Sequence, residues 1–172
     1  NRRAISLTAD LHFTPTAAAT SSLLSEGILK SKIVETGNTV VDAIQLAMPI
    51  VQEDPEKVVT LPDGLGLSVL DGLDFVLATF HRRENFGDGV RQFASAILSF
   101  VDETNCSVVL PVHKNPNIFG PMTDLLGGVE NVFLVDTLDY PTMVFLMSKC
   151  KFKFFHFIPY LVYFYTNYSC RK

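Results

Sequence analysis

The sequence predicts an α/β protein in which helices cover a parallel β-sheet, and three observations support that prediction. Short apolar runs alternate with longer amphipathic stretches in the second half of the chain, the order that builds parallel sheets. The composition, 48% hydrophobic and 19% charged residues, is typical of a packed globular protein rather than a disordered one. A length of 172 residues suffices for one well-cored domain, or for one domain and part of another.

The first third of the chain is expected to contain two strand–helix units. A short strand at 9–13 leads to Thr14-Pro15, a good helix cap followed by a proline suited to the first helical turn. The helix is expected to stop at Gly27. A second strand at 33–36 precedes Gly37-Asn38-Thr39, which turns the chain into an apolar-periodic helix.

Residues 52–72 lose this periodicity and are rich in Pro, Gly and Asp, which indicates a linker or domain boundary. Gly64 and Gly66 resemble the start of a dinucleotide fingerprint. The third glycine position holds Val69, however, and Pro62 disfavours the strand that should come before. We therefore interpret the segment as a connector.

Residues 73–150 return to a regular alternation of strands and helices. The strands are expected at 75–80, 107–112 and 132–135, and the helices at 90–101, 118–126 and 140–149. In such sheets ligands bind beyond the carboxyl ends of the strands, so the loops that open at His81 and His113 are the candidate sites.

Residues 151–172 change abruptly to crowded aromatic side chains. A membrane span needs about 20 mainly apolar residues, and here Lys153, His156 and Pro159 interrupt a shorter run. No span and no membrane partner are expected. The segment is either a buried aromatic strand or a terminus unrelated to the preceding fold, produced by altered splicing or a frameshift, and we favour the second interpretation.

Charge, cysteine usage and missing motifs exclude several function classes. A formal net charge of -4 and a pI near 5.5 provide no basic field to hold nucleic acid. The three cysteines form no CxxC pair, which argues against a zinc site and a disulfide framework and favours a reducing cytoplasm. No nucleoside-triphosphate-binding loop, zinc-protease motif or serine nucleophile elbow occurs.

The chain starts at Asn1 without a leader, so we expect it to begin within a longer protein.

The segment from His81 to Gly87 is the first candidate site. Arg82 and Arg83 offer planar, permanently charged donors beside an imidazole, which suits a diphosphate at the start of the following helix. A surface cluster of salt bridges is an equally open alternative. His113 follows the next strand, so it is expected at the same sheet edge, where it either binds a ligand or hydrogen-bonds its own Asn-Pro turn.

His12 lies in an otherwise apolar strand, and a hydrogen-bonded core histidine is the interpretation we prefer there. Asp42 and Glu84 are acids close to loops, and neither has a sequence partner that marks an acid–base pair.

Six segments together resemble the non-hydrolysing UDP-N-acetylglucosamine 2-epimerases, in the same order and over residues 1 to about 150. They are NRR, ADLHFTPT, TGNTVVDA, HRRENFG, PVHKNPN and GGVENVFLVDTLDYPTMVFLM. The resemblance implies two Rossmann-like domains that face across a cleft, as in glycosyltransferase-B enzymes. Residues 1–51 would then end the first domain and 73–150 would open the second, UDP-binding domain, with 52–72 as the linker.

The resemblance also implies an isomerase that interconverts UDP-N-acetylglucosamine and UDP-N-acetylmannosamine by eliminating UDP and adding it back, without nicotinamide, metal or other cofactor. His81 would be the active-site histidine, placed to stabilise or protonate the departing UDP. Arg82 and His113 would contact nucleotide-sugar phosphates, and Arg83 and Asn38 would lie near the cleft. UDP-N-acetylglucosamine and UDP would be the ligands, and a homodimer is implied because family members commonly dimerise.

Two departures from the family bear on activity. The acidic residues that serve the family as acid and base come from upstream of Asn1, and after Cys150 the aromatic tail stands where the family has a UDP-binding serine–glycine loop. We therefore expect a truncated, inactive form of an epimerase, with exposed sheet edges. The alternatives are a non-catalytic nucleotide-sugar-binding remnant or a glycosyltransferase of the same architecture.

Overall fold

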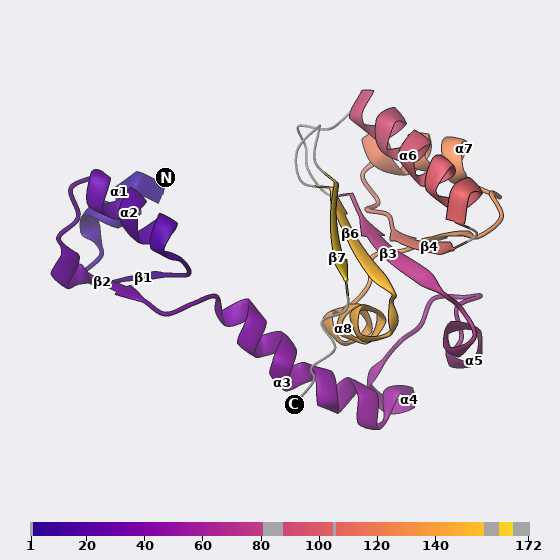
Figure 1. Ribbon diagram of the computed structural model, residues 1–172, viewed down its shortest axis with the longest axis horizontal. Helices are drawn as coiled ribbons and strands as arrows, with labels where there is room; N and C mark the ends of the chain where they lie inside the picture. The colour runs from indigo at the N-terminus through magenta and orange to yellow at the C-terminus, as the bar shows by residue number, and fades with distance from the viewer. Residues whose placement is uncertain (1, 81–87, 105, 157–161, 167–172) are drawn as a thin grey trace. The chain divides into compact units, whose positions relative to one another are not determined.

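The computed structural model describes residues 2–80, 88–104, 106–156 and 162–166 (Figure 1). The chain forms two compact units, residues 1–49 and residues 50–172, which we describe separately. Among the helices of the described segments, none is both long and apolar enough to cross a bilayer.

The first unit is built around a small parallel sheet. Its elements are α1 (Arg2–Thr8), β1 (His12–Thr14), α2 (Ala17–Ser25), the 3-10 helix η1 (Lys30–Lys32), β2 (Ile33–Glu35) and the start of α3 (Thr39–Glu53). Strands β1 and β2 pair in parallel, with His12 opposite Ile33 and Thr14 opposite Glu35. The order strand, helix, strand is the one expected from the sequence.

The predicted cap at Thr14 is wrong by two residues. Thr14 ends β1 and is only 3% exposed, and its hydroxyl lies 2.7 Å from that of Thr20. The cap is Thr16, whose side chain accepts a hydrogen bond of 3.2 Å from the amide of Ala19. Pairing with β2 keeps Thr14 extended, a tertiary effect that local pattern does not contain. The predicted stop is confirmed, because Gly27 follows α2 with a φ of +88°.

The second unit contains a five-stranded sheet of order β5-β4-β3-β6-β7. The strands are β3 (Phe75–Thr79), β4 (Ser107–Pro111), β5 (Val132–Val135), β6 (Phe152–His156) and β7 (Val162–Thr166). The helices are α4 (Pro55–Val58), α5 (Leu67–Asp71), α6 (Asp88–Thr104), α7 (Pro116–Leu126) and α8 (Tyr140–Lys149). All neighbouring strands are parallel except β7, which runs antiparallel to β6.

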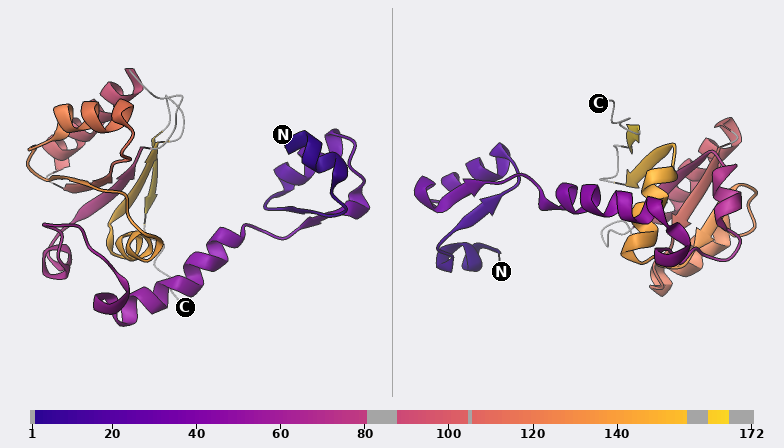
Figure 2. Two further views of the ribbon diagram at one scale, coloured as in Figure 1. Left: turned by 180° about the vertical axis from the view of Figure 1, so that it is seen from behind. Right: turned by 90° about the horizontal axis from the view of Figure 1, so that it is seen from below.

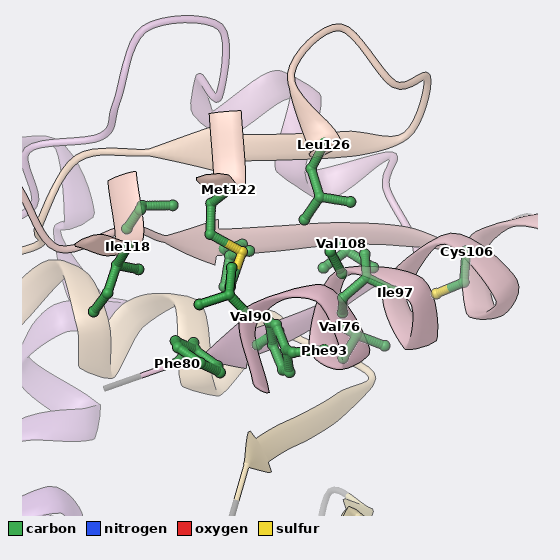
Figure 3. Close-up of a cluster of buried hydrophobic side chains, with 14 residues drawn as sticks. Val76, Phe80, Val90, Phe93, Ile97, Cys106, Val108, Ile118, Met122 and Leu126 are labelled. Carbon is green, nitrogen blue, oxygen red and sulfur yellow. The ribbon is translucent and has the colours of Figure 1, made fainter. Parts of the chain in front are cut away.

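Helices cover both faces of this sheet. Figures 1 and 2 show α6 and α7 side by side on one face and α8 on the other. Because neighbouring strand residues point to opposite faces, Val76 and Ala78 pack under α6 and α7, whereas Phe75 and Leu77 face the other layer. Figure 3 shows the first of these cores, in which Met122 of α7 is fully buried. The predicted α/β class with a parallel sheet is confirmed.

The segment predicted as a linker contains α4 and α5 and is partly packed. Leu65 is 0% exposed and Leu70 is 3% exposed. No strand precedes Gly64 in this described stretch, which agrees with rejecting a dinucleotide fingerprint. The assignment of 52–72 as the boundary between two functional domains stays a prediction.

The aromatic tail extends the sheet. β6 pairs in parallel with β3, with Val76 opposite Phe152, and β7 pairs with β6. Of the two interpretations of this segment, the backbone over 152–156 and 162–166 supports the strand. The origin of the segment stays a prediction.

Candidate functional site

The carboxyl ends of β3, β4 and β5 lie at one edge of the parallel sheet, which is where the sequence predicted the site. The loop after β3 contains His81, Arg82 and Arg83, and also Glu84. All four lie outside the described residues. The described part of the candidate site is therefore formed by the loops after β4 and β5.

His113 lies on this edge and is exposed. The preceding residue anchors the backbone of His113, because Val112 is 3% exposed and donates a backbone hydrogen bond of 2.8 Å to the carbonyl of Val135. The amide of Asn115 donates to Nδ1 of His113 at 3.1 Å. Since Nδ1 accepts, a neutral ring carries its proton on Nε2. The hydrogen bond within the Asn-Pro turn, which we gave as the alternative to ligand binding, is therefore present. It occupies Nδ1 and leaves the N–H of Nε2 as the donor for a ligand.

The same turn starts helix α7. Asn115 is the cap, and its side-chain oxygen accepts a hydrogen bond of 3.0 Å from the amide of Asn117. Pro116 occupies the first helical turn, where its missing N–H costs nothing. This local geometry places His113 just before the N-terminus of α7, where the backbone amides of the first helical turn favour anions.

An ion pair joins the two loops. Lys114 Nζ lies 2.8 Å from Asp136 Oδ2, and Oδ1 of Asp136 accepts a hydrogen bond of 2.7 Å from the amide of Thr137. The hydrogen bond from Lys114, followed by that from Thr137, lowers the pKa of Asp136 below its usual value. Both charged side chains are largely exposed, so the pair orients the loops more than it stabilises the fold.

The loop after β5 is held by buried polar contacts. Asp139 caps α8 by accepting a hydrogen bond of 2.9 Å from the amide of Thr142. Thr142 is 0% exposed, and its hydroxyl accepts from the amide of Thr60 at 3.0 Å and donates to the carbonyl of Thr60 at 3.3 Å. A cavity of 320 Å³ lies between these two segments and includes Pro62 and Leu138 in its lining. Sequence reasoning missed this part of the site, although acids directly after an apolar strand are a usable signal.

Asn38 belongs to the first unit, where it lies directly before α3. Its side-chain oxygen accepts a hydrogen bond of 3.1 Å from the amide of Val40, so it caps the helix locally. Gly37 reaches this turn with a φ of +79°. The predicted substrate contact of Asn38 stays a prediction.

Among the side chains that the structure describes, two buried polar atoms have no hydrogen-bond partner, His12 Nε2 and Thr79 Oγ1. The expectation that His12 is hydrogen-bonded in the core is therefore wrong for this nitrogen. The parallel pairing of β1 with β2 satisfies the backbone around His12 but brings no donor or acceptor to Nε2 of its ring.

Within the described segments, no group of three or more His, Cys, Asp or Glu side chains is arranged to hold a metal ion.

Comparison with known proteins identifies relatives along most of the chain. A family model described as UDP-N-acetylglucosamine 2-epimerase matches residues 1–153. The chain is 36% identical over 155 residues to the UDP-N-acetylglucosamine 2-epimerase of Campylobacter jejuni and 37% identical over 153 residues to that of Neisseria meningitidis. These alignments cover 88% and 87% of this chain but 40% of each relative, so the chain spans well under half of their length.

Solved structures agree with this result. The UDP-GlcNAc 2-epimerase of Neisseria meningitidis, solved with bound UDP-GlcNAc, matches with a TM-score of 0.78 and 35% identity over 89% of this chain and 41% of its own. The S. aureus MnaA–UDP structure matches with a TM-score of 0.72 and 32% identity over 90% of this chain and 39% of its own. The partial two-domain architecture inferred from the sequence is therefore confirmed at the level of fold.

Proposed function

We propose that this chain, which belongs to the UDP-N-acetylglucosamine 2-epimerase family, carries part of the nucleotide-sugar site of an enzyme that interconverts UDP-N-acetylglucosamine and UDP-N-acetylmannosamine. The observation that carries the proposal is the family match over residues 1–153. The loop ends gathered beyond β4 and β5 are the region where ligands bind in sheets of this kind. We also propose that this chain alone does not turn over substrate.

The reaction assigned to the complete enzyme is an elimination followed by a re-addition. A base removes the proton at carbon two of the sugar, the bond from carbon one to the phosphate oxygen breaks, and its electron pair leaves with UDP. UDP then adds back to carbon one while carbon two receives a proton on the opposite face. In this proposal His81 stabilises or protonates the departing UDP, and the acid and base are carboxylates outside the present chain.

The described residues are assigned binding roles. His113 Nε2–H donates to a phosphate oxygen, an assignment supported by its exposure and by the hydrogen bond that occupies Nδ1. Arg82 and Arg83 supply further phosphate contacts, and Asn38 lines the cleft at the start of α3. The ion pair of Lys114 and Asp136 positions the loop that carries His113.

The wider assignments follow from the same proposal. Residues 1–51 end the first Rossmann-like domain, 52–72 connect the domains, and 73–150 open the UDP-binding domain. The ligands are UDP-N-acetylglucosamine and UDP, and the compartment is the cytoplasm. A nucleotide-sugar-binding remnant without activity is the second candidate.

The first experiment measures binding and turnover separately on the whole chain. Calorimetry with UDP-N-acetylglucosamine is expected to detect weak binding, and His113→Ala is expected to weaken it about tenfold through loss of one charge-assisted hydrogen bond. Proton NMR of the same mixture is expected to show no UDP-N-acetylmannosamine.

Lys151→Ala is the matched control for this experiment, because Lys151 lies at the opposite, amino-terminal edge of the sheet, where its amide bonds to the carbonyl of Phe75. Equal loss of binding in both variants would contradict the assignment of His113. Product formation by the chain alone would overturn the proposed inactivity.

A further inference from the structure

His156 is the last residue of β6, the strand that the aromatic tail adds to the sheet of the second unit. This strand lies between β3 and β7, so it is an interior strand of the sheet (Figure 1). It runs parallel to β3, and its carboxyl end therefore lies at the same edge as the carboxyl ends of β3, β4 and β5. That edge is where ligands bind in parallel sheets, so the backbone of His156 lies at the candidate site.

The strand register gives the position of His156 along this edge. Thr79 is paired with Phe155, so the next position along the two strands sets His156 level with Phe80. On its other side His156 is paired with Val162 of β7. The end of β6 is therefore held between two neighbouring strands.

The same register relates His156 to His113. When the pairing of β3 with β4 is continued by the same count, Phe80 is level with Val112, and His113 follows Val112 directly. The two histidines therefore end the two strands that flank β3. Neighbouring strands lie about 4.8 Å apart, so the backbones of β4 and β6 are separated by about 10 Å at this edge.

Contacts at the amino end of β6 fix this register. Cys150, two residues before the strand, is 0% exposed. The amide of Lys151 donates a hydrogen bond of 2.9 Å to the carbonyl of Phe75, at the start of β3. A shift of β6 along β3 would break this bond and move Cys150 out of the core. The placement of His156 at the carboxyl edge therefore follows from contacts at the opposite end of the strand.

We infer that His156 provides a second imidazole at the nucleotide-binding edge and contacts the diphosphate of the ligand together with His113. This inference rests on the proposed function, because it takes a nucleoside diphosphate as the ligand. A histidine carries an N–H donor in either protonation state, and phosphate oxygens accept from it. A diphosphate has oxygens on two phosphorus atoms, so it can accept hydrogen bonds from both sides of β3.

Histidine NMR of the whole, unchanged chain tests the inference, since the sequence contains only four histidines to assign. UDP is expected to shift the imidazole signals of both His113 and His156. Uridine, which has the same base and sugar but no phosphate, is expected to shift neither. His12 is the internal reference, because its Nε2 is buried in the first unit. The signal that disappears in His156→Gln assigns His156.

The variant His156→Gln also measures how much the second imidazole contributes to affinity. In calorimetry it is expected to bind UDP about tenfold more weakly than the unchanged chain, because one charge-assisted hydrogen bond is lost. Lys153→Gln is the matched control, since Lys153 lies in the middle of the same strand, opposite Leu77, and the substitution removes a full positive charge. Its affinity for UDP is expected to equal that of the unchanged chain.

The possible outcomes separate this inference from the proposed function. If UDP shifts His113 but not His156, the inference is overturned and the nucleotide site after β4 stands. If UDP neither binds nor shifts any histidine, the proposed function and the inference both fail. Equal loss of affinity in Lys153→Gln and His156→Gln would also overturn the inference, because the effect would then come from charge or strand stability and not from the position of His156.

Discussion

The two units of this chain differ sharply in how much apolar surface they bury. In the described part of residues 1–49 the one buried hydrophobic side chain is Leu23, while Leu7 and Phe13 are 79% and 67% exposed. Residues 50–172 enclose a continuous core on which α6 and α7 close. The family match runs through both units, yet only the second has the burial that stabilises a fold by itself. Similarity in sequence and self-sufficiency in packing are therefore separate properties.

This difference also divides the candidate site. His113, Asp136 and Asp139 are anchored on the well-packed unit, and Asn38 belongs to the poorly packed one. We expect the loops after β4 and β5 to keep their geometry in the isolated chain. Asn38 is held by the local turn before α3, where its side-chain oxygen accepts from the amide of Val40.

The largest expected loss in the free energy of unfolding comes from a substitution in the core of the second unit. Phe75→Ala removes a side chain that is 0% exposed, and it is expected to lower the free energy of unfolding by about 3–5 kcal/mol through lost burial and a cavity. Chemical denaturation followed by circular dichroism measures this value. Phe13→Ala is the control in the first unit and is expected to change little. Similar losses from the two substitutions would contradict the unequal packing.

A smaller loss is expected where α8 meets the segment before α5. Thr142→Val removes the hydroxyl that bonds both backbone groups of Thr60, which leaves the amide and the carbonyl of Thr60 without this partner. The expected loss in the free energy of unfolding is about 1–3 kcal/mol. Thr137→Val, at an exposed hydroxyl in the loop before α8, is expected to change the free energy of unfolding by less than about 0.5 kcal/mol. An effect of Thr137→Val as large as that of Thr142→Val would refute the difference in burial.

The smallest expected effect concerns charge at the site. Because the pKa of Asp136 is lowered in the folded chain, its contribution to stability is present above its unfolded pKa of about 3.9 and is lost as the pH falls through the lower folded pKa. Lys114→Met removes the main cause of the shift. An NMR titration of the carboxyl carbon is expected to move the pKa of Asp136 upward in this variant. An unchanged pKa would show that Lys114 does not hold the carboxylate.

Much of the second unit could be predicted from local pattern. The strand at 132–135 and the helix at 140–149 match β5 and α8 in full, and the strands expected at 75–80 and 107–112 differ from β3 and β4 by one residue at the end. Apolar runs of this length are buried on both faces of a parallel sheet, and their shortness and β-branched composition distinguish them from buried helices. The first unit was harder, since α1 was not expected and β1 lies later than predicted, at His12–Thr14.

The sequence by itself determined the family, the α/β class and the sheet edge on which His113 lies, because motifs, periodicity and strand order are properties of neighbouring residues. Only the tertiary structure decided the contacts between distant segments. Thr142 with Thr60, Lys114 with Asp136, and β6 beside β3 each join residues far apart in the chain. Such contacts depend on which surfaces packing brings together, and no local pattern encodes that choice.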